Sequence, residues 1–462
     1  MERKEFNLNK IYLYYMLMGL LLLSYFESVF VGGNFAIIIL TISSLIIGII
    51  FTVFITRNYM TPHGVYLFIL FFFSYFLYSS LIHFSLIEVY GVEHIKPDET
   101  TFYQVSKDAM QKLNDNFTYL DITRIQEYVD TPGAVYFLGR IAQYSTMVGE
   151  NTVLSQKVVI SAISALIPMI LYAISRLYLS ERISVYMALI YGFFSFVPYL
   201  SSMILRDIHV ALMFIITIYI LLQKFSFLNF LLLIIVSFFS YSLREQTGIF
   251  MMGFISVYLF VFIENLVQSK IRRFLVYMTI AASLLFIVLS STFLMDMFNL
   301  ISNSSAERSE ASSSSGSLGA KISKLPFGLN VLALFGFSQI QPFPPLWIFS
   351  GANKGFFELT YLIAAVSWFF GWGFLVYAFV RKNIFDKVDL KLKLIFLFSI
   401  AYLILIAVVD FSQRRQMPVY PIIYLFMVFS YLKMDKSERI KVWITMLMCY
   451  MTLVFTINYL KL

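Results

Sequence analysis

The chain has 462 residues, of which 60% are hydrophobic and only 13% are charged, and it contains 50 phenylalanines and 31 tyrosines. No water-soluble domain needs so much apolar surface, so we expect an all-α, polytopic transmembrane helical bundle. The net charge of +8 indicates loops that face anionic membrane lipid, and no nucleic acid partner is expected. The single cysteine excludes a disulfide framework and a cysteine metal cluster within the chain.

Apolar runs of about 17–25 residues recur along the whole length, and we predict a single integral membrane domain over 1–462 with thirteen spans. The first run lacks a small-residue cleavage site, so it is interpreted as a retained span. The spans are predicted near 11–31, 35–56, 65–88, 157–179, 183–204, 207–223, 225–243, 247–267, 273–295, 355–380, 393–411, 418–433 and 441–460.

The distribution of lysine and arginine predicts the orientation in the membrane. Of the 34 basic residues, 19 fall on the side of the N-terminus, ten lie in two long loops, and only five lie in the short segments of the opposite side. Short cytoplasmic loops are enriched in basic residues, whereas long loops cross regardless of charge. We therefore expect the N-terminus in the cytoplasm and both long loops outside the plasma membrane. The many Ile, Phe, Tyr, Lys and Asn residues indicate an AT-rich genome and hence a bacterial source.

The first long loop, 89–157, is predicted to carry amphipathic helices on the outer membrane surface. After Asp98-Glu99, apolar side chains recur at helical spacing. The apolar positions are Phe102, Val105, Ala109, Leu113 and Phe117.

The second long loop, 296–354, combines two different segments. Residues 302–318 contain nine serines in seventeen positions and are expected to form a mobile loop. Residues 325–350 are apolar, but three prolines follow within 342–345 and argue against a straight span. We predict that this second segment is re-entrant or interfacial on the outer side.

The basic residues on the outer side are the main candidates for a functional site. Arg206, Arg244, Arg414 and Arg415 fall at the outer ends of apolar spans, where guanidinium groups can hold phosphate. Two simpler readings stay open, namely pairing with a nearby carboxylate and extension toward lipid headgroups. Neighbouring residues on a helix do not face each other, which argues against the pairs Arg206–Asp207 and Arg244–Glu245. Asp207, Glu245 and His209, the last at i+3 from Arg206, are predicted to support the arginines.

Asp98 and Glu99 are the candidate catalytic carboxylates. A carboxylate at the membrane surface can deprotonate a hydroxyl nucleophile, and Asp98 is also a candidate ligand for Mg²⁺ or Mn²⁺. The simpler reading is a helix start, with Asp98 as the cap and Glu99 in the first turn.

These motifs resemble the membrane-embedded glycosyltransferases of the C-type fold (GT-C), which include protein mannosyltransferases and lipid A aminoarabinose transferases. The resemblance covers roughly Asp98 to Phe254, with a second patch from Arg414 to Tyr424. It lies in Asp98-Glu99 with Tyr103, and in TPGAVYFLGRIAQY, SSMILRD, SLREQTG and RRQMPVYPIIY. The acidic loop follows the third predicted span here, whereas in the family it usually follows the first.

The resemblance implies a GT-C-like fold and glycosyl transfer on the extracytoplasmic face, from a polyprenyl-phosphate or polyprenyl-diphosphate sugar donor to a glycan or lipid-linked acceptor. It implies that Asp98 is the general base or a metal-associated carboxylate, and that Arg206, Arg244 and Arg415 hold the donor phosphate. The outline also resembles the Wzy and EpsG type polysaccharide polymerases, which join diphosphate-linked repeat units. A flippase for lipid-linked sugars is the alternative from another class, although the predicted span interiors are nearly free of charge.

Overall fold

The computed structural model describes residues 10–57, 62–93, 97–112, 117–125, 131–266, 274, 322, 325–326, 328–340, 355–382, 384–385, 388–409 and 413–461. Within these ranges the regular secondary structure is entirely helical, which confirms the predicted all-α class. Several predicted features fall outside the described residues: the span 273–295 apart from residue 274, the serine-rich segment 302–318, and the prolines near 342–345.

The N-terminal part is a group of long apolar helices packed around one buried helix. Helices α1 (Lys10–Phe30), α2 (Phe35–Thr56) and α3 (His63–Tyr90) lie together, and α2 and α3 pack against α7 (Val153–Ser175). The α1–α2 turn contains Gly32 and Gly33 with φ of +72° and +85°, a conformation that glycine adopts without strain. Nearly every side chain of α7 is buried, so this helix is the centre of the bundle.

The first long loop folds into three helices that cover one end of this group. They are α4 (Pro97–Lys112), α5 (Tyr119–Thr123) and α6 (Pro132–Val148), and α4 and α5 both pack on α6. The amphipathic pattern predicted here is present in α4. Its apolar side is covered by protein, because Ala109 joins Phe117, Ile122 and Val135 in a small separate core.

The middle of the chain contains α8 (Glu181–Phe194), α9 (Val197–Ser201), α10 (Arg206–Leu222), α11 (Phe227–Leu243) and α12 (Glu245–Leu266). The predicted span 183–204 is not one continuous helix, since α8 stops after Phe194 and α9 begins at Val197, and its crossing of the membrane stays a prediction. Pro198 in the first turn of α9 has no N–H to continue the preceding ladder. The hydroxyl of Ser195 instead accepts from the backbone N–H of Val197.

The C-terminal part packs around α17 (Gly355–Arg381), α18 (Leu390–Val409) and α20 (Tyr420–Lys433). Its other elements are α16 (Leu329–Ile340), α19 (Gln413–Gln416), the 3₁₀ turn η4 (Met417–Val419) and α21 (Lys436–Lys461). Twelve residues make α16 only about 18 Å long, too short to cross a hydrocarbon core of about 30 Å. It packs against α17 and α18, and the re-entrant placement of this region stays a prediction.

Seven helices in the described part of the chain are long and apolar enough to cross a membrane. They are Ile11–Phe30, Phe35–Thr56, His63–Glu88, Val153–Ser175, Leu359–Arg381, Leu390–Ala407 and Lys436–Thr456. A helical membrane bundle is therefore supported, and the count of thirteen stays a prediction.

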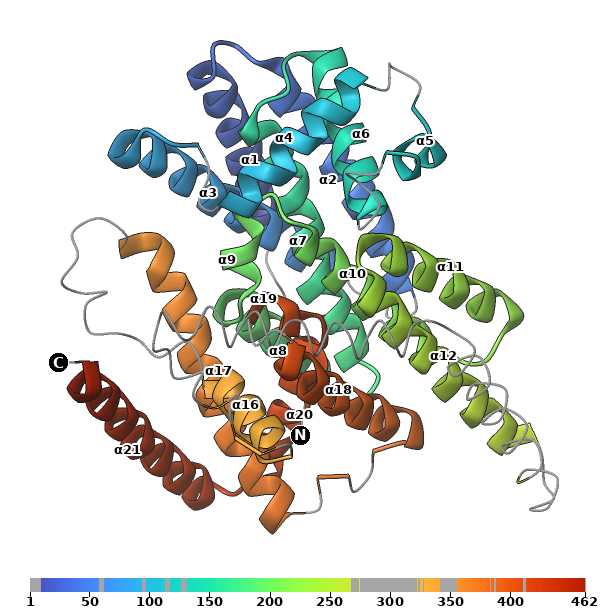
Figure 1. The fold of residues 1–462 in the computed structure, drawn as a ribbon, viewed down its shortest axis with the longest axis vertical. Coiled ribbons are helices and arrows are strands. Elements are labelled where there is room, and N and C mark those ends of the chain that lie inside the picture. The colour runs from blue at the N-terminus through green and yellow to red at the C-terminus, as the bar shows by residue number, and fades with distance from the viewer. Residues whose placement is uncertain are drawn as a thin grey trace.

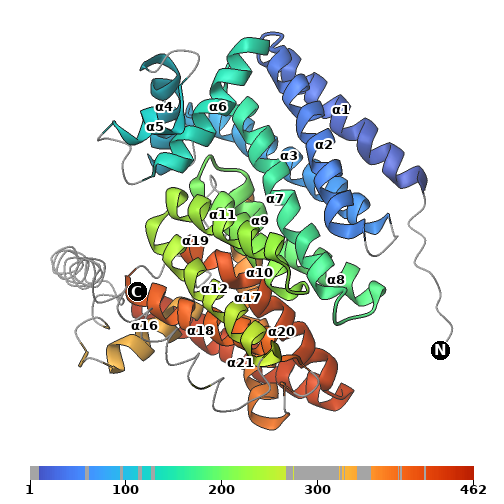
Figure 2. The same ribbon diagram turned by 90° about the vertical axis from the view of Figure 1, so that its right-hand side faces the viewer.

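The N-terminal and the C-terminal groups of helices are separated by helices from the middle of the bundle (Figures 1 and 2). In both views α7 and α10 lie between the N-terminal helices and the C-terminal ones. Helix α21 lies at the edge of the bundle, and it exposes Trp443, Leu447, Met448 and Phe455 on its surface. Such a continuous apolar face suits contact with lipid.

Candidate functional site

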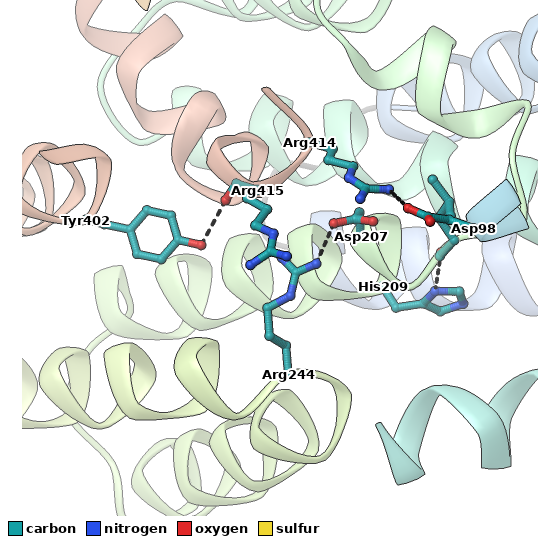
Figure 3. A network of polar contacts seen from close by, with 8 residues as sticks. Asp98, Asp207, His209, Arg244, Tyr402, Arg414 and Arg415 are labelled. Carbon is teal, nitrogen blue, oxygen red and sulfur yellow. Dashed lines mark hydrogen bonds and ion pairs between the residues drawn. The ribbon is translucent and has the colours of Figure 1, made fainter. Parts of the chain in front are cut away.

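Residues far apart in the sequence meet where several helices begin or end (Figure 3). The start of α4, the start of α10, the end of α11 and the short helix α19 contribute to one network of polar contacts. All four arginines predicted for the site belong to these segments. They lie close enough for Arg206 to feel the positive charges of the other three.

Asp207 and Arg244 form a buried ion pair at the centre of the network. The Nη2 atom of Arg244 lies 2.7 Å from Oδ1 of Asp207, and the two side chains are only 7% and 3% exposed. Arg244 is placed by the break between α11 and α12, where its extended backbone interrupts the helical run. The adjacent carboxylate Glu245 is exposed and accepts from the hydroxyl of Tyr241. Among the described residues no ion pair joins it to the four arginines, and its supporting role stays a prediction.

The Arg244 guanidinium has hydrogen-bonding capacity left over. Its Nε and Nη1 atoms are buried, and within the described part of the chain neither has a hydrogen-bond partner. A buried charged donor left unsatisfied costs about 1–3 kcal/mol or more, so an acceptor that reached these atoms would be bound favourably. The guanidinium of Arg415 points toward that of Arg244, and the backbone carbonyl of Arg415 accepts from the hydroxyl of Tyr402 at 2.9 Å (Figure 3).

Asp98 and Arg414 form a second ion pair between Nη1 and Oδ2, and it joins residues 316 positions apart. This pair is more accessible than the first, since Asp98 is 48% exposed and Arg414 is 30% exposed. Asp98 lies in the first turn of α4, where the helix dipole stabilises a carboxylate. Asp98 and Glu99 thus both lie at the start of a helix, as predicted, but Asp98 is in the first turn and is not its cap, because the helix begins at Pro97.

The cluster carries an excess of positive charge. Four arginines face two carboxylates, Asp98 and Asp207, and the Arg206 guanidinium also lies over the ring of Phe102, 5.9 Å from its centroid. Like charges gathered in a poorly hydrated place repel strongly. A bound anion would lower this repulsion, and guanidinium groups match the oxygens of phosphate.

His209 lies beside this cluster and faces helix α6. Its ring meets Phe137 edge-on at 4.7 Å, and its Nδ1 lies 3.3 Å from the carbonyl oxygen of Leu205. A carbonyl can only accept, so Nδ1 is the donor in this contact, and in the neutral ring Nε2 then has the lone pair. Nε2 is buried and has no hydrogen-bond partner among the described residues. The contacts make His209 part of the wall of the site.

Glu99 and Tyr103 anchor helix α4. Glu99 is fully buried and lies 3.2 Å from the Nζ atom of Lys157, which is also fully buried. The Tyr103 hydroxyl donates to the backbone carbonyl of Asn151 at 3.1 Å. Burial and the nearby charge of Glu93 raise the pKa of Tyr103 to about 12, so its hydroxyl keeps its proton at neutral pH. Lys157 was not a sequence-based candidate, although a lysine at the start of an apolar run is a usable signal.

A set of buried glutamines holds the short helix α19 that carries Arg414 and Arg415. The side-chain amide of Gln413 donates to the carbonyl of Ser338 at 2.8 Å, and that of Gln339 donates to Gln416 at 2.9 Å. Gln413 also accepts from the hydroxyl of Tyr420. Sequence reasoning missed these residues because isolated glutamines and tyrosines in apolar segments carry no motif.

The surroundings of Asp98 do not suit a divalent cation. Its carboxylate forms an ion pair with Arg414, and the next residue, Glu99, forms an ion pair with Lys157. Among the described residues, no group of three His, Cys, Asp or Glu side chains could hold a metal ion. Mg²⁺ and Mn²⁺ prefer several oxygen ligands, and arginine beside them is unfavourable. The metal role of Asp98 stays a prediction, and no step below depends on it.

No family model, no curated protein and no solved structure matches this chain. Its function is therefore inferred from its own residues.

Proposed function

We propose that this chain is a membrane glycosyltransferase that uses a polyprenyl-phosphate or polyprenyl-diphosphate sugar donor in the assembly of a cell-surface glycan. The observation that supports it most is the buried Arg244 guanidinium, whose Nε and Nη1 have no described hydrogen-bond partner and which lies among three further arginines. A lipid-linked phosphate offers the oxygens that such a group needs.

In the proposed reaction the arginines act on the leaving group. As the bond between the sugar C1 and the phosphate oxygen breaks, negative charge grows on the phosphate. Donors already fixed around that oxygen stabilise this charge without reorganising, which is the largest contribution in many enzymes. Arg244, held by Asp207, and Arg415, held through its backbone by Tyr402, are the donors with the firmest anchors.

Asp98 is proposed as the general base. The acceptor hydroxyl attacks C1 from the side opposite the phosphate, its proton passes to the Asp98 carboxylate, and polyprenyl phosphate or diphosphate departs. In the structure Asp98 is paired with Arg414. We propose that the donor phosphate draws Arg414 away, which frees the carboxylate and raises its basicity. This exchange would couple donor binding to activation of the acceptor.

The proposed topology places this chemistry on the extracytoplasmic face of the bacterial plasma membrane, in a GT-C-like bundle of thirteen spans. The arginine cluster lies where helices begin or end. The long isoprenoid chain of the donor would lie between the helices, with its phosphate at the membrane–water boundary. Charges gathered at the ends of helices favour a reaction at the membrane surface over transport across the membrane, because a transporter needs polar groups near the middle of the membrane.

The test is mass spectrometry of the lipid-linked sugars that accumulate when the gene is deleted. Build-up of a single sugar on polyprenyl phosphate, beside an undecorated glycan, would support the GT-C reading. Build-up of complete repeat units on polyprenyl diphosphate, with loss of long chains, would favour a Wzy-type polymerase. Unchanged lipid-linked sugars would exclude both and leave the arginines as ligands of membrane lipid.

A further inference from the structure

Glu99 lies next to the proposed base, yet the proposed chemistry does not use it. Its side chain and that of Lys157 are both completely buried, with Nζ and Oε1 3.2 Å apart. The same carboxylate oxygen accepts from the backbone N–H of Ile204 at 3.2 Å. Ile204 lies two residues before Arg206, in the short connection between α9 and α10. One carboxylate therefore contacts α7 and the chain just before α10, while it is itself part of α4.

The spacing along α4 shows what this contact does. Glu99, Tyr103 and Ser106 are separated by four and three residues, so they lie on one face of the helix. All three meet the first turns of α7 or the chain just before it: Glu99 pairs with Lys157, Tyr103 donates to Asn151, and Ser106 accepts from the side chain of Gln156 at 2.9 Å. This face is the anchoring face of α4.

A second face of the same helix meets the arginines. Asp98 and Phe102 are four residues apart, which puts them on one side, and they contact Arg414 and Arg206 respectively. Each residue of this face precedes a residue of the anchoring face by one position. A rotation of α4 that broke the anchoring face would therefore move Asp98 and Phe102 away from their arginines.

We propose that the buried Glu99–Lys157 pair is a positioning unit, which sets Asp98 and Arg206 at once by fixing the rotation of α4 and the start of α10. The inference rests on the proposed function in so far as Asp98 and Arg206 act on the substrate. Loss of one partner leaves an uncompensated buried charge, whereas neutral side chains of similar shape in both positions keep the packing. Misplacement of a reacting group by about 1 Å can lower a rate about 100-fold.

The test compares Glu99→Gln, Lys157→Met and the double variant with the wild type, using a polyprenyl-phosphate or polyprenyl-diphosphate sugar as donor. Glutamine still accepts from Ile204, and methionine fills the volume of the lysine chain. We expect each single variant to lose about 100-fold in kcat/KM, with both kcat and the donor KM affected, because base and arginine move together. The double variant should recover to within about tenfold of the wild type.

A second readout needs no activity. In a Cys449→Ser background, which removes the one native thiol, Phe102→Cys and Arg206→Cys are introduced together and joined with a short bifunctional thiol reagent. The crosslink yield should fall in Glu99→Gln and return when Lys157→Met is added. If Glu99→Gln alone does not fold, the double variant is compared directly with the wild type by the same yield.

The outcomes separate the two proposals. A double variant with native crosslink yield but no activity would give Glu99 a direct chemical role and overturn the positioning role. Unchanged kinetics and crosslinking in Glu99→Gln would overturn it as well. If the wild-type chain transfers no sugar while the crosslink yield still follows the pair, the proposed function fails and the positioning by Glu99 is supported.

Discussion

Asp207 in α10 and Arg244 in the break between α11 and α12 form an ion pair of 2.7 Å, and both side chains are almost completely buried. Asp207 satisfies one nitrogen of the guanidinium, and Nε and Nη1 have no described hydrogen-bond partner. The ion pair therefore fixes the orientation of the Arg244 guanidinium and leaves Nε and Nη1 able to donate hydrogen bonds. Arg244 is in this sense prepared for an acceptor, which is how fixed donors become effective in binding and catalysis.

The first prediction concerns the cost of removing that anchor. Asp207→Asn leaves the buried Arg244 charge uncompensated, and breaking such a pair destabilises a protein by about 3–5 kcal/mol. We expect a clearly lower Tm of the purified protein in detergent. Glu245→Asn is the matched control, because Glu245 is an exposed carboxylate next to Arg244, and its Tm should stay unchanged. Equal losses of Tm in the two variants would show that the buried ion pair contributes no more to stability than the exposed carboxylate of Glu245.

The second prediction concerns phosphate binding. Arg244→Lys keeps the charge but loses the planar fork that reaches two oxygens at once. A hydrogen bond to a charged group contributes about 1.5–3 kcal/mol, so the affinity for polyprenyl phosphate should fall about 10–100-fold. The measurement is binding of polyprenyl phosphate to the protein in lipid nanodiscs. Arg124→Lys, an arginine exposed on the outer layer, serves as the control. Unchanged affinity in Arg244→Lys would count against its phosphate role.

The third prediction separates the base from the phosphate group. Asp98→Asn removes the proton acceptor, and a general base contributes about 10²–10⁴-fold to a rate. We expect kcat to fall by that factor while binding of the donor is retained or strengthened, because Arg414 loses its competing partner. Asp108→Asn on the same helix is the control, since the Asp108 carboxylate accepts from the side chain of Gln104 on α4 itself. Normal turnover in Asp98→Asn would refute the base assignment.

The parts of the fold that the sequence predicts correctly are the long helices formed by unbroken apolar runs. Long uninterrupted runs such as 35–56 and 157–179 correspond to α2 and α7, whose length and composition suffice to define a span. The run 183–204 is also mostly apolar, yet the helix is broken at Ser195, where Pro198 follows and the Ser195 hydroxyl accepts from the N–H of Val197. Hydropathy averaged over a window of residues does not reveal such local interactions.

The candidate site was predictable in its residue types but not in its pairs. Arginines at the outer ends of spans stand out in the sequence, because charge is costly there. Which carboxylate each arginine meets depends on how helices cross, and Arg414 meets Asp98 across 316 residues. Glu99 was grouped with Asp98 by adjacency. A step of one residue turns a helix by about 100°, so the two carboxylates face different partners.

The fourth prediction concerns metal dependence. Asp98 is paired with Arg414, and a divalent cation at Asp98 would have to displace that arginine. We therefore expect EDTA to leave the rate of glycosyl transfer by purified protein within about twofold, since general-base chemistry at Asp98 needs no cation. Loss of activity that Mg²⁺ or Mn²⁺ restores would instead assign Asp98 as a metal ligand. Parallel treatment of Asp98→Asn would show whether the cation acts at that carboxylate.

The last prediction concerns the side of the membrane on which the site lies. Helix α5 belongs to the same layer as α4, since both pack on α6, and Leu120 on α5 is 64% exposed. Arg182 at the start of α8 is also exposed and belongs to the side that collects most of the basic residues. Basic residues are retained in the cytoplasm. Leu120 on α5 and Asp98 on α4 should therefore lie outside, and Arg182 inside.

Thiol labelling in intact cells measures this directly. In a Cys449→Ser background, Leu120→Cys should react with a membrane-impermeant maleimide, and Arg182→Cys should react only after the membrane is permeabilised. The opposite pattern would place the arginine cluster on the cytoplasmic face. Its phosphate ligand would then have to come from a cytoplasmic pool, and transfer from a sugar donor presented outside the cell would be excluded.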